Sequence, residues 1–295
     1  MRSLVRVAER GSFSAVAREL GIGQSTVTRH VRELEDALGV RLLSRTTRRV
    51  SLTEEGRRYY ASSIQVLRLV DQATDEVRSG SEAPAGTVRI SCTAAFGVLH
   101  LCPLVFAFQD LFPEIGIDLS LTDDRIDLVR EGVDVAVRLG PLTDSAMKLR
   151  SLGMSPRILV AAPQYLAERG RPMSPLDLAK HEGVRMSNVA GSDMLIFRRP
   201  GDQSLSVPFG GRLRVDHGLA AREALKAGRG IGIAHRWLVS DLLEEGALEL
   251  LLPDYELPPV QLSLLIVPER AAIARVRHLV DFLSEHIPPA AFLSS

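Results

Sequence analysis

Polar side chains that could read DNA bases gather on the first two turns of a segment that begins near residue 24. They offer an amide, two hydroxyls and two guanidinium groups, namely Gln24, Ser25, Thr28, Arg29 and Arg32. Apolar residues occupy the other face at helical spacing, namely Val27, Val31, Leu34 and Leu38. Because such a helix buries one face and presents hydrogen-bonding groups from its N-terminal turns, it is suited to the major groove of DNA.

The preceding segment supplies the first half of a helix-turn-helix. Residues 14–20 contain good or tolerable helix formers, and Ser14 is the expected N-cap. Gly21 stands where a left-handed residue should end this helix, and Gly23 precedes the second helix. An ordinary pair of packed helices with a solvated polar face fits the same spacing, so this pattern alone leaves both interpretations open.

A short basic hairpin is expected between residues 41 and 53. Two β-prone runs flank a tip that carries Arg45, Thr46, Thr47, Arg48 and Arg49. An arginine at such a tip can enter the narrow minor groove while the helix occupies the major groove. The sequence therefore predicts a wing, with Arg48 and Arg49 as candidate DNA contacts.

Charge is distributed unevenly along the chain. Residues 1–60 hold twelve Arg, no Lys and seven Asp or Glu, which gives 12 − 7 = +5. The whole chain of 295 residues is neutral, so residues 61–295 carry −5. Arginine binds phosphate and guanine through a planar fork, so a basic N-terminal region fits a nucleic-acid partner.

Length and composition are those of an ordinary globular protein of two or three domains, with 45% hydrophobic and 24% charged residues. The sequence has no run of 18 apolar residues and no signal-like start, which predicts no membrane span and a cytoplasmic location. Cys92 and Cys102 are too few for a disulfide framework, and each stands in an apolar segment where cysteine usually acts as a small hydrophobe. A redox switch between them is the alternative.

A long helix is expected from Thr53 to about Gly80. Thr53 can cap it, and Glu54 and Glu55 favour the positive end of the helix dipole. Its apolar stripe is narrow and comprises Ile64, Leu67, Val70 and Val77. Such a stripe is too thin for a globular core but suits a helix seam between two chains. Residues 79–86, rich in Ser, Gly and Pro, then form a hinge-like boundary.

From residue 87 onward, apolar strands alternate with helices. The runs TVRISCTAA, IGIDLSLTDD and VDVAVRLG are typical of strands with helices between them, which predicts βαβ units and a parallel sheet. One helix is expected from about Phe96 to Phe112, and another over the C-terminal ARVRHLVDFLSEHI. The pattern is too long for one small sheet, so we expect two α/β lobes joined by crossing strands.

Residues 11–56, GSFSAVARELGIGQSTVTRHVRELEDALGVRLLSRTTRRVSLTEEG, resemble the N-terminal domain of LysR-type transcriptional regulators, and the likeness continues to the C-terminus. The resemblance implies that the positions Gln24, Ser25, Thr28 and Arg29 contact DNA and that Arg48 reaches the minor groove. The chain departs from the family at two places. Gly23 replaces the usual capping Ser or Thr, and the first helix has only residues 2–10, so either the true start lies upstream or this helix is short.

The resemblance also implies an architecture. The expected fold is α/β with an all-α winged-helix N-terminal domain: a winged helix-turn-helix over 1–58, a linker (dimerisation) helix and hinge over 59–86, and an effector-binding domain over 87–295 that resembles periplasmic binding proteins. Lobe one is expected at 87–162 plus 268–295, and lobe two at 163–267. The family dimerises through the linker helix, and pairs of dimers form tetramers.

Effector contacts are expected between the lobes, outside the carboxyl ends of the strands, where helix N-termini present free N–H groups. The strand-to-helix junctions supply the candidates: Thr93, Ala94, Ala95, Phe96, Arg138, Gly140, Ser187, Asn188, Asp216, His217 and Ile231. The subfamily that the chain resembles often has a carboxylate-anchoring Ser near Ala95, which is absent here. Capping or packing is the plainer interpretation of each single residue, and Asp216 could be an N-cap.

Other chemistry finds no support in the sequence. Gly228, Gly230 and Gly232 form G-x-G-x-G, but they follow a helix and precede a strand, the reverse of a dinucleotide-binding turn. No nucleophile elbow, zinc-protease motif or paired-cysteine motif occurs, and the seven His lack metal-ligand spacing. We therefore expect no enzyme activity, no metal and no cofactor other than a small-molecule inducer. His30, on the recognition helix, is expected to face DNA or solvent.

The sequence thus predicts a transcriptional regulator that binds promoter DNA and responds to a small molecule held between its lobes. Expected partners are double-stranded promoter DNA, the effector, further copies of the chain in a dimer or tetramer and, as a candidate, RNA polymerase; no membrane partner is expected. The competing hypothesis is a solute-binding module or an enzyme that carries a helical N-terminus. The lack of a signal peptide argues against transport, and the lack of a catalytic constellation argues against an enzyme.

Overall fold

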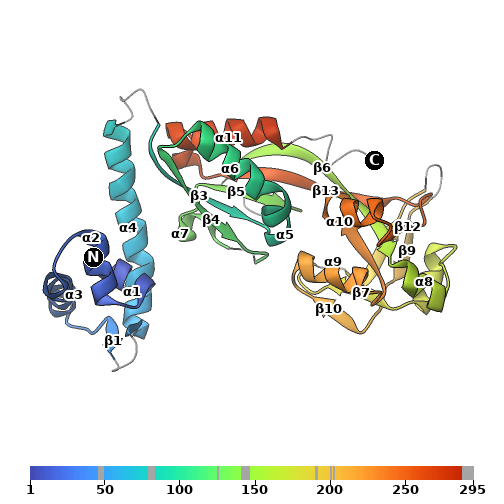
Figure 1. Ribbon diagram of the computed structural model, residues 1–295, viewed down its shortest axis with the longest axis horizontal. Coiled ribbons are helices and arrows are strands. Elements are labelled where there is room, and N and C mark those ends of the chain that lie inside the picture. Colours follow the sequence, from blue (N-terminus) through green and yellow to red (C-terminus); the bar gives the residue numbers. More distant parts are fainter. Residues whose placement is uncertain are drawn as a thin grey trace. The chain divides into compact units, whose positions relative to one another are not determined.

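The computed structural model describes residues 1–45, 50–78, 84–124, 126–140, 147–189, 192–199, 201 and 203–287. Internal contacts divide the chain into an N-terminal unit up to residue 82, with which residues 129–132 are grouped, and a C-terminal unit from residue 83. Helices dominate the first unit, and a mixed sheet with helices on it dominates the second (Figure 1).

The N-terminal unit consists of three short helices, a two-stranded hairpin and one long helix (Figure 1). In chain order they are α1 Arg2–Arg10, α2 Phe13–Leu20, α3 Gln24–Leu38, β1 Leu43–Arg45, β2 Val50–Leu52 and α4 Glu54–Arg78. The hairpin is antiparallel, with Leu43 opposite Leu52. These elements confirm the predicted helix-turn-helix, wing and long helix. The wing tip, including Arg48 and Arg49, lies outside the described residues.

Helix α2 begins two residues earlier than the sequence predicts. Ser12, not Ser14, is its N-cap, because Ser12 is the last extended residue and its Oγ accepts a hydrogen bond from the Ala15 N–H at 3.3 Å. At the other end Gly21 adopts φ 64°, the left-handed conformation expected of the turn. Gly23 precedes α3 in extended conformation and offers no side-chain cap.

Helix α4 begins inside the predicted DNA-binding domain of 1–58. The Gly56 N–H donates to Thr53 Oγ1 at 2.9 Å, so Thr53 caps the helix as expected. A Cβ atom on Gly56 would lie 2.0 Å from the Leu42 carbonyl oxygen, so the first turn of α4 packs directly on the base of the wing. The helix therefore belongs in part to the DNA-binding unit rather than to a separate linker from residue 59.

The first three helices and the wing share one core. Its fully buried members include Leu4, Val7, Val16, Val27, Val31 and Leu42. The predicted apolar face of α3 is only partly correct, because Leu38 is 42% exposed. The third inward position of that face is instead Glu35, a carboxylate that is only 4% exposed.

The C-terminal unit alternates strands and helices. Its first half is β3 Gly86–Cys92, α5 Ala94–Phe96, the π-helix η1 Gly97–Leu101, α6 Cys102–Leu111, β4 Ile115–Leu121, α7 Leu128–Glu131, β5 Val135–Leu139 and β6 Lys148–Ala161. The middle is α8 Pro163–Arg169, the 3₁₀ helix η2 Pro175–Lys180, β7 Gly183–Met186, β8 Met194–Phe197, β9 Leu205–Pro208, β10 Leu213–Val215 and α9 Gly218–Lys226. The last part is β11 Ile231–His235, α10 Arg236–Glu244, β12 Glu249–Leu251, β13 Leu257–Ile266, η3 Pro268–Arg270 and α11 Ala274–His286.

One sheet runs through the whole C-terminal unit in the order β10-β7-β11-β6-β13-β5-β3-β4. Strands β3, β4 and β5 are parallel at one end, and β7, β10 and β11 are parallel at the other. Between them β6 and β13 pair antiparallel to each other and to their neighbours. The sheet is therefore mixed, with two parallel ends joined by two long strands, as two lobes with crossing strands require.

The boundary between the lobes falls within the crossing strands rather than at their ends. Lys148 of β6 pairs with Ile266 of β13 beside lobe one, whereas residues 157–160 of β6 pair with β11 in lobe two. The predicted boundaries at 162/163 and 267/268 therefore lie at the C-terminal ends of β6 and β13, whereas the structure places the change of lobe within these strands. Helices α6 and α11 lie side by side on one face of lobe one (Figure 1), where Phe108 and Phe282 pack with ring centroids 5.4 Å apart.

The predicted helix from Phe96 to Phe112 is a composite that begins at Ala94. It runs through α5, the π-helix η1 and α6 without a break. Its length and composition alone would allow Ala94–Leu111 to cross a membrane, although the core helix of a soluble protein passes the same test. Here Phe96, Leu101, Val105 and Phe108 are buried in the main core, which is the position of a core helix.

Candidate nucleic-acid interface and effector site

The N-terminal turns of α3 present the predicted base-reading groups. Gln24 and Ser25 are exposed, and Thr28 is half-buried with its Oγ1 donating to the Gln24 carbonyl at 3.0 Å. On the opposite face Val27 and Val31 are fully buried, so the orientation of the helix is fixed by its own core. The structure therefore brings Gln24, Ser25 and Thr28 together on one accessible surface.

The two arginines of this helix hold loose ion pairs. Arg29 Nε lies 3.7 Å from Glu33, and Arg32 Nε lies 3.8 Å from Asp36, with side chains 67% and 77% exposed. Exposed pairs at this spacing contribute little stability, so either guanidinium group can exchange its carboxylate for a phosphate.

The imidazole of His30, also on α3, turns inward, because its Nδ1 lies 3.1 Å from the Oγ of buried Ser3 on α1. The imidazole is half-buried and contacts α1, so it does not point into open solvent as one of the two expectations had it.

A buried carboxylate connects α3 to the wing. Glu35 Oε1 accepts from the backbone N–H groups of Leu42 and Leu43 at 2.8 and 3.0 Å, and Oε2 lies 3.4 Å from Arg41. This carboxylate therefore satisfies two backbone N–H donors at the start of the wing, from the buried face of the recognition helix. The geometry fixes the first strand of the wing relative to α3.

In lobe one, three neighbouring parallel strands bring polar groups to one sheet edge. Arg138, at the end of β5, donates to Ser91 Oγ at 2.8 Å and to the Thr122 carbonyl at 3.3 Å. Asp123, after β4, accepts from the Ala94 N–H at 2.9 Å, while its other carboxylate oxygen is buried without a partner in the described structure. Burial lowers the pKa of Arg138, although an arginine remains charged at neutral pH.

The other lobe-one candidates surround this edge. Thr93 precedes α5 and is half-buried, whereas Ala94, Ala95 and Phe96 are buried. Gly140, directly after β5, has φ 106° and donates its N–H to the Gln261 carbonyl at 2.9 Å. Among these residues only Thr93 and Gly140 retain partly accessible surface.

In lobe two, β7 and β10 end side by side. The Ser187 N–H donates to the Val215 carbonyl at 2.7 Å, and Asn188 Nδ2 donates to the Asp216 carbonyl at 2.8 Å. His217 caps α9, because its Nδ1 accepts from the Leu219 N–H at 3.2 Å. The imidazole therefore performs the capping role that was the alternative interpretation of Asp216, which is exposed.

The two sets of junctions face each other. A Cβ atom on Gly218, the first residue of α9, would lie 3.0 Å from the Cβ of Ala95 on α5. The structure thereby brings the lobe-one candidates of α5 close to the lobe-two candidates that precede α9. Ile231 does not join them. It pairs with Gly183 at the amino end of β7, at the opposite sheet edge, and its side chain is fully buried in the core of lobe two.

Comparison with known proteins decides the family. Residues 81–288 match the family model described as "LysR substrate binding domain", and residues 1–57 match "Bacterial regulatory helix-turn-helix protein, lysR family". The chain belongs to the LysR family of transcriptional regulators. Its N-terminal unit holds the DNA-binding helix-turn-helix and its C-terminal unit is the effector-binding domain. Proteins of this family are regulators rather than enzymes, they form oligomers, and small-molecule effectors typically modulate them.

Named relatives of this LysR-family chain are similar over nearly their whole length. It is 32% identical to the HTH-type transcriptional regulator DmlR of Escherichia coli over 98% of this chain and 95% of that protein. It is 30% identical to the HTH-type transcriptional activator AaeR of the same species over 97% and 92%.

Two full-length LysR-type structures share the fold. The Vibrio cholerae virulence activator AphB superimposes with a TM-score of 0.66 and 28% identity over 97% of this chain and 98% of that one. CrgA of Neisseria meningitidis gives a TM-score of 0.63 and 31% identity over the same shares. The likeness extends over both units of the chain, as the sequence resemblance implies.

Sequence reasoning missed one junction of the effector domain. Strand β11 ends at His235, and α10 follows with Trp237, so this junction lies at the carboxyl end of its strand while Ile231 does not. Trp237 Nε1 donates to Ser155 Oγ at 3.1 Å, and the same Oγ lies 2.8 Å from His235 Nδ1. His100 of η1 packs edge-on against Trp237 from lobe one. The signal was present in the run GIGIAHRWL, where a strand pattern passes directly into a helix.

Proposed function

We propose that this LysR-family regulator binds promoter DNA as a homodimer, and as a pair of dimers, through contacts from Gln24, Ser25, Thr28, Arg29 and Arg32. The observation that carries the proposal is the exposed N-terminal surface of α3 above a fully buried face. Amides and hydroxyls read base edges in the major groove, and guanidinium groups bind guanine or phosphate. Arg48 and Arg49, at the wing tip, are proposed to reach the minor groove.

The effector is proposed to bind between the lobes, beside the α5 and α9 junctions. Candidate contacts at the accessible edges are Thr93, Arg138, Gly140, Asn188 and His217, supported by the approach of Gly218 to Ala95. A ligand that binds one arrangement of the lobes more tightly than another shifts the population of lobe arrangements, and DNA affinity changes by linkage. Such a regulator acts in the cytoplasm, where it meets promoter DNA and, as a candidate partner, RNA polymerase.

The base-reading proposal is tested with Gln24→Ala on a set of duplexes that each carry one base-pair change in the footprinted operator. Loss of a bidentate amide contact should remove discrimination at one base pair, worth roughly 1–3 kcal/mol. Discrimination at the other positions should persist. Gln65→Ala on the exposed surface of α4 is the matched control. An unchanged base-preference profile for Gln24→Ala would overturn the assignment of this residue.

The effector proposal is tested by thermal denaturation of the full chain against a panel of small organic acids, amines and aromatic metabolites. A ligand that stabilises the parent protein should lose most of this effect with Asn188→Ala or Arg138→Gln. Equal stabilisation of the parent and both variants would place the ligand elsewhere.

A further inference from the structure

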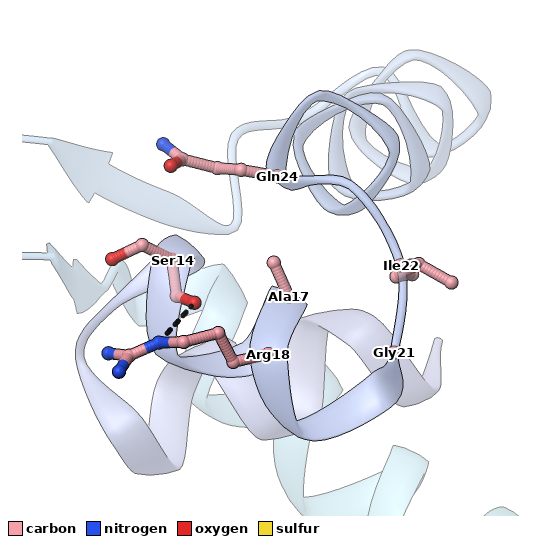
Figure 2. Close-up of a pocket in the computed structure, with 6 residues that line it drawn as sticks. All are labelled: Ser14, Ala17, Arg18, Gly21, Ile22 and Gln24. Carbon is pink, nitrogen blue, oxygen red and sulfur yellow. Dashed lines mark hydrogen bonds between the residues drawn. The ribbon is translucent and has the colours of Figure 1, made fainter.

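The helix-turn-helix has an open depression between α2 and α3, with Ser14 and Arg18 on one side and Gln24 on the other (Figure 2). It is part of the DNA-binding unit and adds no separate site. The effector domain, in contrast, contains a direct contact between side chains of its two lobes. This contact lies where strand β11 ends and α10 begins, and α10 packs beside α9.

On the lobe-two side the contact is made by Trp237, the first buried residue of α10. Its Nε1 donates to Ser155 Oγ at 3.1 Å, and Ser155 is fully buried on the crossing strand β6. The indole also stacks on His235, with ring centroids 5.5 Å apart and planes 16° from parallel. One hydrogen bond and one stacked ring therefore fix the orientation of the indole from within lobe two.

On the lobe-one side His100 and Phe96 reach the same tryptophan. His100 Nε2 lies 3.2 Å from the Trp237 carbonyl oxygen, which makes Nε2 the donor because a carbonyl only accepts. Both rings meet the indole edge to face, His100 at 5.4 Å and Phe96 at 5.2 Å between centroids. Edge-to-face aromatic pairs contribute stability beyond the area they bury.

Two local features of the backbone accompany this contact. His100 belongs to the π-helix η1, and single π-helical turns are rare and occur frequently at functional sites. Gly218, at the start of α9, comes so close to α5 that an added Cβ would lie 3.0 Å from the Cβ of Ala95. We call Ala95, Phe96, His100, Gly218 and Trp237 the inter-lobe latch.

We propose that the inter-lobe latch holds the lobes in the arrangement seen here, and that its release changes the affinity of the chain for its operator. All of these contacts come from the chain's own residues, so they stabilise this arrangement by themselves. An effector that favours a different arrangement must break them, which lowers its apparent affinity. This inference rests on the proposed function, and it makes His100 and Trp237 positioning residues for the lobes.

Disulfide trapping tests whether the latch holds the lobes. Ala95→Cys combined with Gly218→Cys is made in a full chain whose Cys92 and Cys102 are replaced by alanine. Cβ atoms joined by a disulfide lie about 3.5–4.5 Å apart, so a small movement admits the bridge. Mass spectrometry of the non-reduced chain, sampled over time in a glutathione redox buffer, gives the rate at which the bridge forms.

Adding His100→Ala to this chain should slow bridge formation roughly fivefold or more, because the lobes lose an aromatic contact and a hydrogen bond. His278→Ala is the matched control. His278 is also half-buried and packs on a phenylalanine, Phe112 at 5.1 Å, but both residues of that pair belong to lobe one. This control should form the bridge at the rate of the unmodified double-cysteine chain.

Operator affinity tests whether the latch acts on DNA binding. His100→Ala should change the affinity for the footprinted operator by about fivefold or more, the lower end of typical coupling between sites. When the Ala95–Gly218 bridge is present in the same variant, the oxidised chain should recover the parent's affinity, and dithiothreitol should abolish the recovery.

Gly218→Val is a second variant that removes no aromatic or polar contact. Its side chain would push α9 away from Ala95, so the operator affinity should change in the same direction as in His100→Ala. His278→Ala should bind the operator like the parent. Thermal denaturation of each variant identifies any that is unfolded at the temperature of the binding assay.

The outcomes separate this inference from the proposed function. Suppose that the parent discriminates operator from scrambled DNA, but the oxidised bridge leaves the affinity of His100→Ala at its reduced value. The latch then does not govern DNA binding, and the regulator stands. Trapping of His100→Ala at the parent rate, or opposite affinity changes in His100→Ala and Gly218→Val, would also overturn the latch. If the parent itself does not discriminate, the proposed function fails, and the trapping rates alone decide whether the latch holds the lobes.

Discussion

At the scale of single residues, Glu35 joins the recognition helix to the wing. It is only 4% exposed, and its Oε1 accepts from two backbone N–H groups at 2.8 and 3.0 Å. A buried donor left without an acceptor costs much more than a typical hydrogen bond contributes. The position of the wing therefore depends on one buried carboxylate of α3.

Glu35→Ala should release the start of the wing. Loss of the charged acceptor is expected to cost about 2–3 kcal/mol, which makes amide exchange at Leu42 and Leu43 roughly 30- to 150-fold faster. Hydrogen exchange of the full chain, followed on peptides that cover residues 41–45, measures this directly. The exchange rate of Glu35→Gln, which keeps one acceptor, should lie between those of the parent and Glu35→Ala. Glu33→Ala, on the exposed face of α3, should exchange like the parent. Unchanged exchange in Glu35→Ala would show that these bonds do not hold the wing.

His235 should make the effector domain sensitive to acid. Burial lowers its pKa from 6.5 to about 4, and the neighbouring Arg157 charge acts in the same direction. Because the folded pKa is below the unfolded one, the unfolded chain binds a proton first as pH falls. Stability is therefore complete above about pH 6.5 and decreases as pH falls toward 4, by about 2 kcal/mol between pH 7 and pH 5.

Urea unfolding at pH 7 and pH 5 measures this loss through the fluorescence of Trp237, the single tryptophan of the chain. Trp237 stacks on His235 at 5.5 Å, so it reports on the right region. His235→Asn should remove most of the difference between the two pH values. His286→Asn, on the exposed end of α11, should retain it. Equal acid sensitivity in His235→Asn and the parent would assign the effect to other groups.

At the scale of elements, α4 offers an apolar surface that differs from the predicted one. Val66, Leu69 and Val70 are 44%, 62% and 51% exposed, whereas Ile64 and Leu67 are half-buried. The exposed residues are spaced at i, i+3 and i+4 and so form one stripe along the helix. We expect this stripe, rather than Ile64 and Leu67, to be the centre of the seam between two copies; Val77 lies among side chains outside the described set.

Val66→Asp combined with Leu69→Asp should therefore convert the proposed dimer to monomers, because each copy would place two charges in the seam. Light scattering coupled to size-exclusion chromatography gives the mass directly. Ser62→Asp combined with Gln65→Asp adds the same charge at exposed polar positions of α4 and should leave the mass unchanged. Retention of the parent mass by the Val66/Leu69 variant would move the interface to another surface.

The sequence predicted elements better than their ends. Periodicity identified α3, α4 and α11, because each has a long apolar stripe that only one helical face can bury. It misplaced the α2 cap, since Ser12 and Ser14 are equally good caps and only backbone geometry separates them. It also missed the π-helix η1, Glu35 and the inward turn of His30, since each depends on tertiary contacts that no local pattern records.

The effector candidates show the same limit. Thr93, Arg138, Asn188 and His217 were selected because parallel strands end at a common edge, and as effector contacts they stay predictions. Ile231 was misassigned because the turn before β11 lies at the amino edge, and only the strand pairing with Gly183 reveals this. His235 ends the same strand at its carboxyl edge, and Trp237 follows in α10.

At the scale of the whole molecule, the chain combines a basic N-terminal region of net charge +5 with a remainder of −5. The LysR-family match spans both units, so one chain carries both the DNA-binding surface and the domain that senses a small molecule. By linkage, an effector that changes DNA affinity must itself bind with a different affinity when DNA is present. Measurements of DNA affinity with and without effector, and of effector affinity with and without DNA, therefore report the same coupling free energy.

The most direct measurement is fluorescence anisotropy of the full chain on DNA from immediately upstream of its own gene, beside a scrambled duplex of equal composition, titrated with salt. Specific binding should exceed non-specific binding by about 10³-fold or more, with a log–log salt slope of about −0.9 for each phosphate contacted. Equal, weak binding to upstream and scrambled DNA at low salt would contradict sequence-selective recognition by α3.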